Sequence, residues 1–225
     1  MSSAPRELRA DRPFRVLPYG PHASLLELDS LTEVEDLFAF LSDARAAGEL
    51  GGVTELVPAG RTVMIEAEDP SARAAAVATC EQWVPGTADV RAGELHEIPV
   101  DYSGPDLDDV ARQIGGSTSD VIRLHSEPTY RVAFMGFSPG FGYLTGLPEK
   151  LQLPRRDDPR DAVPPRSVAV AGEFSAVYPR TSPGGWNLIG HATVPLWDDD
   201  WPRPNRLAPG DEVRFVPQSE GKAHV

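Results

Sequence analysis

The sequence contains very little cysteine or lysine, and it has no long hydrophobic run. Because Cys80 is the single cysteine, an intramolecular disulfide and a cluster of thiolate metal ligands are both excluded. A chain without disulfides is typical of the reducing cytoplasm, where we expect this protein to act. No apolar segment approaches the length that crosses a bilayer, and we expect residues 1–12 to be a disordered leader rather than a signal peptide.

The charge of the chain is strongly one-sided. The formal net charge is −13, which argues against nucleic acid and anionic membranes as partners because both repel a polyanion. Only two of the 21 basic residues are lysines. The other cations are arginines, whose planar guanidinium groups match the geometry of carboxylates and phosphates. A small anionic ligand therefore fits the composition.

Several catalytic motifs are also absent. The chain has no Walker-type phosphate loop, and its five histidines show no zinc-binding spacing, so we expect no metal site of its own. Residues 136–140 fit the G-x-S-x-G pattern of hydrolases. However, the residue after Ser138 is Pro139, which has no N–H to donate to an oxyanion. Ser138 is therefore not expected to be a nucleophile.

The first half of the chain alternates between strand and helix patterns. Apolar residues recur at helical spacing over residues 31–47, where Thr32 and Glu35 are suited to form a capping box. A second helix is expected over residues 71–83. Strands are predicted at residues 14–17, 23–28, 52–58 and 61–67. This order predicts an α+β fold with a small ferredoxin-like N-terminal domain over residues 13–93.

The second half is richer in proline and glycine, and its apolar stretches are short. Helices are predicted over residues 106–115, with Asp106 as the N-cap, and over residues 117–124. Strands are predicted at residues 96–102, 131–134, 167–171, 176–178, 186–189 and 213–216. Short strands separated by turn residues are typical of a β-barrel. We therefore predict a barrel domain over residues 94–218, followed by a tail at residues 219–225.

Glycines and aromatic residues are concentrated in residues 134–144. Such a segment can wall a ligand pocket, because glycine permits close backbone approach and aromatic rings supply apolar surface. A structural loop over the end of a barrel would have the same composition. In residues 183–186, successive glycine N–H groups are available to bind an anion, although a tight hairpin turn is the alternative.

Three arginines and two histidines are further candidates. Arg155, Arg156 and Arg160 are close enough in sequence to clamp a carboxylate or phosphate, or to pair with the neighbouring aspartates in a solvated loop. His125 and His191 are candidate polar residues of a pocket, although a structural role is the usual alternative for a histidine.

These segments resemble the family that contains the B-type subunit of 5-oxoprolinase, allophanate hydrolase subunit 1 and the kinase inhibitor KipI. The stretch GFSPGFGYLTGLP at residues 136–148 is similar to the family's G-F-x-P-G-F-x-Y-L-x-G-L block. Residues 153–168 resemble its P-R-R-x-x-P-R-x-x-V-P-x-G-S-V block, and SPGGWNLIG at residues 182–190 resembles its S-P-G-G-W-x-x-I-G block. The resemblance extends over residues 14–217.

The resemblance implies a carboxyltransferase subdomain C/D architecture with a cyclophilin-like C-terminal β-barrel. It implies ATP-dependent cleavage of the cyclic amide of 5-oxoproline to glutamate by a complex, with the chain inactive alone. ATP, with Mg, would lie at or near the interface with a sister subunit from the family of the 5-oxoprolinase C-type subunit and allophanate hydrolase subunit 2. The candidate catalytic residues are His125, Arg155, Arg156, Arg160 and His191. The candidate substrate-binding residues are Phe137, Pro139, Gly140, Phe141, Tyr143, Glu173, Tyr178, Gly184, Gly185 and Trp186.

Two other functions remain open at this point, namely KipI-like inhibition of a histidine kinase and a role in urea or allophanate hydrolysis. The sequence also departs from the family pattern near the expected pocket. His191 stands where the family usually has arginine, and Arg166 stands where it more often has glycine. These departures leave the identity of the substrate open.

Overall fold

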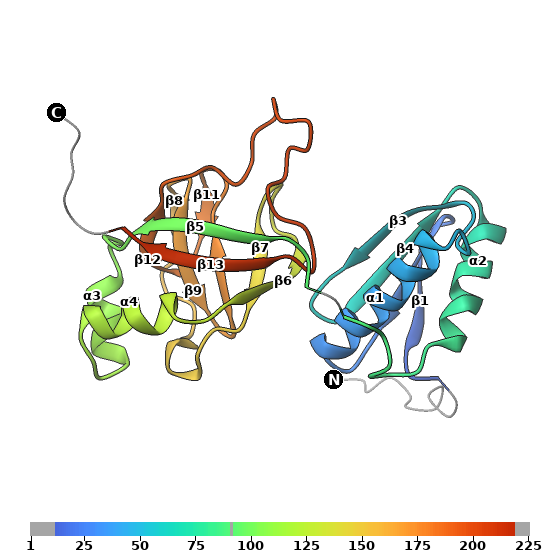
Figure 1. Cartoon of the computed structure of the whole chain (residues 1–225), viewed down its shortest axis with the longest axis horizontal. Coiled ribbons are helices and arrows are strands. Elements are labelled where there is room, and N and C mark those ends of the chain that lie inside the picture. Colours follow the sequence, from blue (N-terminus) through green and yellow to red (C-terminus); the bar gives the residue numbers. More distant parts are fainter. Residues whose placement is uncertain (1–11, 91, 219–225) are drawn as a thin grey trace. The chain divides into compact units, whose positions relative to one another are not determined.

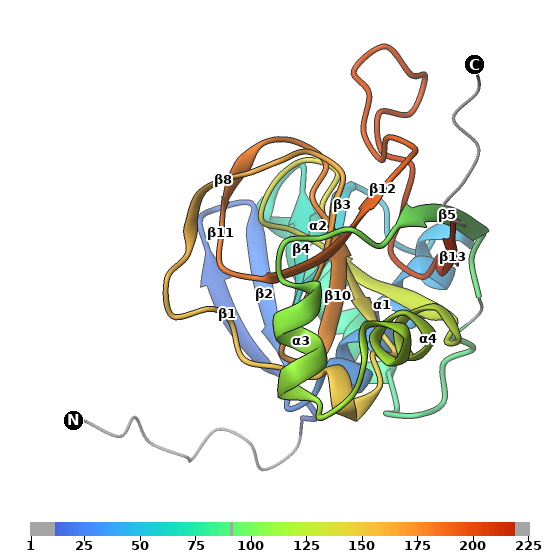
Figure 2. The ribbon, with the colours of Figure 1, turned by 90° about the vertical axis from the view of Figure 1, so that its left-hand side faces the viewer.

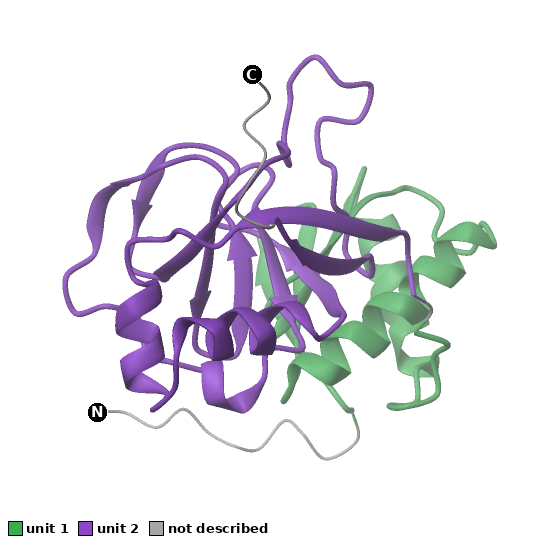
Figure 3. Ribbon diagram, turned by 60° about the vertical axis from the view of Figure 1, so that its left-hand side comes forward, with its two compact units in different colours: residues 1–91 green, residues 92–225 purple. Residues whose placement is uncertain are grey.

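The computed structural model describes residues 12–90 and 92–218, and these two ranges form two compact units, which we call unit 1 and unit 2 (Figure 3). The expected leader, apart from its last residue, and the expected tail lie outside the described residues. Each unit has its own hydrophobic core. None of the helices in the described ranges combines the length and the apolar content that a bilayer crossing needs.

Unit 1 is a four-stranded antiparallel sheet with two helices (Figure 1). Its elements are β1 (Arg15–Tyr19), β2 (Ala23–Glu27), α1 (Leu31–Ala46), β3 (Val53–Pro58), β4 (Thr62–Ala67), α2 (Pro70–Thr79) and the 3₁₀ turn η1 (Cys80–Gln82). The strand order is β1-β2-β4-β3. This is the order of a ferredoxin-like sandwich in which an edge strand comes from the start of the chain instead of following the second helix.

The first helix begins earlier than its predicted cap. The Ser30 hydroxyl accepts the N–H of Glu33, and the Glu33 carboxylate accepts the N–H of Ser30. The capping box therefore consists of Ser30 and Glu33, and the predicted pair of Thr32 and Glu35 is wrong. Ser30 has an extended backbone, whereas Thr32 already lies inside the helix and cannot be its N-cap.

Unit 2 is a closed barrel with strand order β10-β7-β6-β13-β5-β12-β9. The strands are β5 (Leu95–Asp101), β6 (Tyr130–Met135), β7 (Gly142–Thr145), β9 (Ser167–Ala171), β10 (Phe174–Val177), β12 (Asn187–Ala192) and β13 (Glu212–Pro217). β5 and β13 run parallel and side by side (Figure 1), and the other pairs in the barrel are antiparallel. A separate ribbon pairs β8 (Arg160–Val163) with β11 (Ser182–Gly184).

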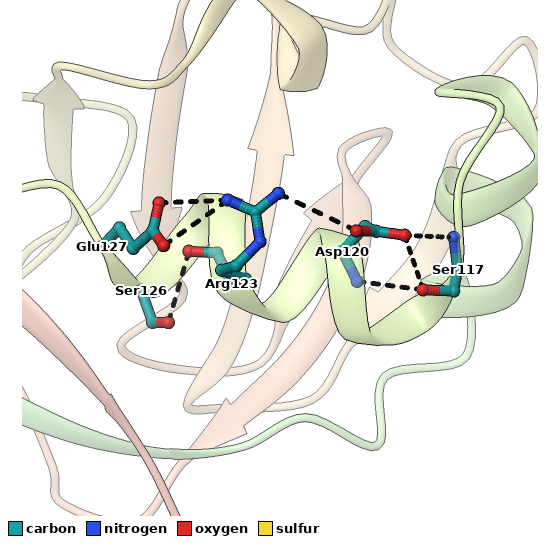
Figure 4. A network of polar contacts seen from close by, with 5 residues as sticks. All are labelled: Ser117, Asp120, Arg123, Ser126 and Glu127. Carbon is teal, nitrogen blue, oxygen red and sulfur yellow. Dashed lines mark hydrogen bonds and ion pairs between the residues drawn. The ribbon is translucent and has the colours of Figure 1, made fainter.

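Two short helices connect β5 to β6, and they pack against each other and against the barrel (Figure 2). They are α3 (Leu107–Gln113) and α4 (Thr118–Ser126), and the 3₁₀ turn η2 (Glu149–Leu151) lies further along the chain. α4 begins with a capping box of Ser117 and Asp120, and Arg123 joins Asp120 to Glu127 along the exposed face (Figure 4). The predicted start of this helix is therefore confirmed.

The wall of the barrel is buried on both faces, and this positions the candidate site. Along β9, Val168 and Val170 belong to the core that fills the barrel, whereas Ala169 and Ala171 belong to a separate, mainly aromatic cluster. This division follows from the alternation of side chains along a strand. Val163 of β8 also belongs to the aromatic cluster, so the β8–β11 ribbon covers part of the outer face. The site therefore lies outside the barrel wall and not inside the barrel.

Candidate functional site

A cavity of about 120 Å³ lies at this outer face. Its lining residues are Phe137, Phe141, Tyr143, Arg155, Tyr178, Gly184, Gly185 and Trp186. The fold thus brings together the two glycine- and aromatic-rich segments and the first arginine of the arginine loop, which we define as residues 154–160. All eight residues were candidates from the sequence. That they bind a substrate stays a prediction.

The walls of the cavity are aromatic rings that contact one another edge to face. The centroid of the Phe141 ring lies 5.1 Å from that of Tyr143, 5.2 Å from that of Tyr178 and 5.5 Å from that of Trp186. Each such contact contributes about 0.5–1.5 kcal/mol beyond simple burial. Since Phe141, Tyr178 and Trp186 are also buried, the shape of the cavity is fixed by its own packing.

Gly184 is required by the hydroxyl group of Tyr178. A Cβ on Gly184 would lie 2.3 Å from Tyr178 Oη, whereas a Cβ on Gly185 would meet its neighbours only at ordinary distances of 3.5 Å or more. Neither glycine has a positive φ. The two glycines therefore do not form an αR-αL nest, and anion binding by their N–H groups stays a prediction.

The Tyr178 hydroxyl stays protonated at neutral pH. Burial raises its pKa above the ordinary value, while a hydrogen bond from the backbone N–H of Trp186 and the positive charge of Arg155 act in the opposite direction. Because the hydroxyl oxygen accepts the Trp186 N–H, its own proton is left to donate to a ligand oxygen.

Phe137 stands at the edge of the cavity in a strained turn. Its φ is 64°, and the N–H of Ser138 donates to the carbonyl of Gly136 at 2.7 Å, which makes a γ-turn with a positive φ. A non-glycine residue in this region costs about 1–2 kcal/mol. The ring is 58% exposed and contacts Phe141 edge to face. The backbone therefore holds an aromatic ring outward beside the cavity.

The arginine loop is fixed by Asp106, which the sequence predicted only as a helix cap. Its Oδ1 accepts Nη1 of Arg156 at 2.7 Å and Nη2 of Arg160 at 2.8 Å, and its Oδ2 accepts the N–H of Leu188 at 2.7 Å. The side chain is 3% exposed. Asp106 is the N-cap residue of α3, as predicted, but its side chain makes no capping hydrogen bond to the helix, because the carboxylate is used by the arginines and by Leu188.

Arg155 is the arginine of this loop that faces the cavity without a partner. No hydrogen bond or ion pair joins its guanidinium group to any of the residues that the structure describes, whereas Arg156 and Arg160 are both held by Asp106. The expected alternative, in which the arginines pair with the neighbouring aspartates, is wrong. Asp106 takes their place because the fold brings it to the loop from about 50 residues away.

Three of the predicted substrate-binding residues do not line the cavity. Pro139 and Glu173 are exposed and are not among the residues that line it. Gly140 has a φ of 85°, and a Cβ there would lie 2.8 Å from the Cβ of Trp197 and 2.9 Å from that of Pro179. The close packing and the positive φ therefore require glycine at position 140, and this residue does not line the cavity.

His125 lies in the core of the barrel and not at the cavity. Its Nδ1 lies 2.8 Å from Tyr102 Oη and its Nε2 lies 2.8 Å from Ser175 Oγ, and its ring packs on Phe215. Burial lowers the pKa of His125 to about 3, so the ring is neutral at physiological pH. With both nitrogens bonded and no exposed surface, His125 is a structural residue, and its candidacy for catalysis at this cavity is wrong.

His191 is a half-buried residue of β12, paired with Ser167 of β9 and Asp101 of β5, and it does not line the cavity. Its pKa is lowered, mainly by burial and then by the positive charge of Arg166. Arg166 has a φ of 65°. The left-handed backbone at this position accounts for the glycine of the family pattern.

Comparison with known proteins gives the family. The family described as carboxyltransferase domain, subdomain C and D, matches residues 14–207. The B-type subunit of 5-oxoprolinase from Escherichia coli O157:H7 is 39% identical over 207 residues, which cover 90% of this chain and 95% of that protein. The protein of the same name from Bacillus subtilis (strain 168) is 41% identical over 132 residues, 57% of this chain and 55% of that protein.

Two solved structures are similar to this chain over most of its length. The crystal structure of TTHA0988 is similar with a TM-score of 0.75 and 35% identity, covering 88% of this chain but 40% of that chain. The chain thus spans less than half the length of TTHA0988. PH0987 from Pyrococcus horikoshii is 33% identical, with a TM-score of 0.55 and coverage of 92% of this chain and 98% of that chain. We conclude that this chain belongs to the carboxyltransferase subdomain C and D family, in the branch that contains the B-type subunit of 5-oxoprolinase.

Proposed function

We propose that this chain is the B-type subunit of an ATP-dependent 5-oxoprolinase complex, which opens the cyclic amide of 5-oxoproline to glutamate. The observation that carries the proposal is the aromatic cavity beside the unpaired Arg155. The relative that is 39% identical over 90% of the chain is named for this complex. A protein named as a subunit implies further subunits, and we propose a sister chain of the C type as the partner.

The cavity suits this substrate in size and chemistry. 5-Oxoproline is a small ring with two apolar faces, an amide and a carboxylate. A cavity of about 120 Å³ is well below the ~300–1,000 Å³ of sites for drug-sized ligands, so it selects a single small ring. Aromatic walls suit the ring faces, and the guanidinium group of Arg155 matches the carboxylate in charge and shape.

The residues of the cavity also suit the reaction. An unstrained amide resists water because its carbonyl carbon is a poor electrophile, and ATP, when bound, would supply the phosphoryl group that activates the amide oxygen. Arg155 would hold the substrate carboxylate and so orient the ring. Phe141, Tyr143 and Trp186 would exclude water, which strengthens each polar contact in the cavity. The protonated Tyr178 hydroxyl would donate to a substrate oxygen.

The two alternative functions have less support. Urea amidolyase of Lachancea kluyveri matches only 24% of this chain, and the solved urea amidolyase of K. lactis is 18% identical, which shows a shared fold alone. A KipI-like role, in which a pocket of the barrel domain binds a proline-containing segment, is not favoured either, because the similar proteins are named 5-oxoprolinase subunits and urea amidolyase.

The proposal is tested by ATP hydrolysis in a reconstituted complex. The purified chain is assayed alone and with its sister subunits, with and without 5-oxoproline. We expect hydrolysis that depends on 5-oxoproline only in the complex. Stimulation by allophanate in place of 5-oxoproline, or no stimulation by either compound, would contradict the proposal.

A further inference from the structure

A second cavity, which we call the polar basin, lies beside the aromatic cavity and shares Arg155 with it. Its volume is about 320 Å³, and the charged residues that line it are Arg155, Arg156, Asp157 and Asp158. The function proposed above does not use this space. Since Arg155 lines both cavities, a ligand in the polar basin would lie next to a substrate in the aromatic cavity.

The opposite charges around the polar basin do not neutralise each other. No hydrogen bond or ion pair within the described ranges joins Asp157 or Asp158 to Arg155, although the three are near neighbours in sequence. Arg156 donates to Asp106 on its other side. Unpaired carboxylates and an unpaired guanidinium group therefore face the same concave surface. Such a surface suits a ligand that carries both signs of charge.

The backbone around the polar basin is held in place. Nδ2 of the buried Asn187 donates to the carbonyl of Pro154 at 3.0 Å, and the N–H of Arg156 donates to the carbonyl of Gly185 at 2.7 Å. With the ion pairs to Asp106, these bonds fix the arginine loop at both ends. The backbone of the loop is thus held in place, while the side chains of Arg155, Asp157 and Asp158 are exposed to solvent.

A magnesium-bound phosphate fits this set of side chains. Mg²⁺ takes one or two carboxylates and completes its shell with water and phosphate oxygens. This fits a site with two aspartates, and the described residues contain no group of three or more acidic, histidine or cysteine ligands that would form a protein cage. Guanidinium groups bind phosphate through charge-assisted hydrogen bonds, and Nε of Arg156 is buried without a partner.

We propose that the polar basin binds the magnesium-bound terminal phosphates of the phosphoryl donor. Asp157 and Asp158 would hold Mg²⁺, and Arg155 and Arg156 would hold phosphate oxygens. Arg155 would then stand between the phosphate and the substrate. This inference rests on the proposed function, because it gives the donor of that reaction a place in this chain.

Inorganic pyrophosphate is the probe, and calorimetric titration of the full chain with and without MgCl₂ is the measurement. Without Mg²⁺, pyrophosphate is repelled by the carboxylates of Asp157 and Asp158 in the polar basin, whereas a bound Mg²⁺ attracts both the pyrophosphate and the carboxylates. We expect binding at least about tenfold tighter with Mg²⁺. In Asp157→Asn/Asp158→Asn this ratio should fall to about one, and Arg155→Gln should weaken binding in both buffers.

The matched control is Asp199→Asn/Asp200→Asn, which removes the same charge from two adjacent residues on the loop between β12 and β13 (Figure 1). The control should keep the magnesium ratio of the unmodified chain. A ratio of one in the unmodified chain, or equal losses in both double variants, overturns the proposal. Titrating 5-oxoproline into the same samples separates the two claims: pyrophosphate binding without 5-oxoproline binding refutes the proposed function alone, and the reverse refutes the polar basin alone.

Discussion

Replacing Asp106 with asparagine tests whether this buried carboxylate organises the site. Asp106 accepts two arginines through Oδ1 and the N–H of Leu188 through Oδ2. Asparagine has nearly the same shape but only one oxygen. Whichever way its amide is turned, an NH₂ group faces a donor that needs an acceptor.

The cost follows from these contacts. Facing the arginines with NH₂ removes charge-assisted hydrogen bonds worth about 1.5–3 kcal/mol each, and facing Leu188 leaves a buried N–H unpaired at about 1–3 kcal/mol. The charge that balances two guanidinium groups is lost in either case. We therefore expect Asp106→Asn to lower the free energy of unfolding by about 3 kcal/mol, within the range for breaking a buried ion pair.

Equilibrium unfolding in urea at neutral pH measures this change. Asp108→Asn is the control, because Asp108 is exposed in the first turn of the same helix and has no hydrogen bond or ion pair in the described structure. Its loss should cost less than about 1 kcal/mol, the size of a helix-dipole effect. Equal, small effects of the two substitutions would refute the account of the arginine loop.

Three further predictions concern the cavity, the barrel core and a strained turn. Gly184→Ala places a Cβ against the Tyr178 hydroxyl and should lower the free energy of unfolding in urea by about 1–3 kcal/mol. Gly185→Ala should leave this free energy nearly unchanged, and equal losses in the two variants would contradict the prediction. The folded chain keeps His125 neutral, whereas the unfolded chain protonates it below about pH 6.5. The free energy of unfolding should therefore fall by up to about 1.4 kcal/mol per pH unit between pH 6 and pH 4, and less steeply in His125→Gln. Equal slopes in the two proteins would contradict this prediction. Arg166→Gly, at a φ of 65°, should raise the thermal midpoint through relief of about 1 kcal/mol of strain, and a lower midpoint would show that the side chain matters more than the backbone.

Much of the fold follows from local sequence patterns. The predicted α+β class with a C-terminal barrel is confirmed, because apolar periodicity and turn residues are local signals. The predicted helix at residues 31–47 is observed as Leu31–Ala46. The place of β1 at the sheet edge beside β2 was not predicted, since strand order depends on contacts between distant segments.

The site could be predicted only in part. The glycines and aromatic residues of the cavity could be predicted as site residues, because a segment so rich in both is unusual in a strand or helix. Asp106 was missed as a site residue, because its partners are 50 and 54 residues away and an aspartate before a helix has an ordinary explanation as a cap. His125 was predicted as a candidate catalytic residue, because the sequence does not show that its ring is enclosed by Tyr102, Ser175 and Phe215.

The proposed function requires that the aromatic cavity bind 5-oxoproline through Arg155. This binding can be measured by calorimetric titration of 5-oxoproline into the full chain, into Arg155→Gln and into Arg203→Gln, which alters an exposed arginine outside the aromatic cavity. We expect binding to the unmodified chain, a loss of about tenfold or more in Arg155→Gln and no change in Arg203→Gln. Equal affinity of the unmodified chain and Arg155→Gln would contradict it.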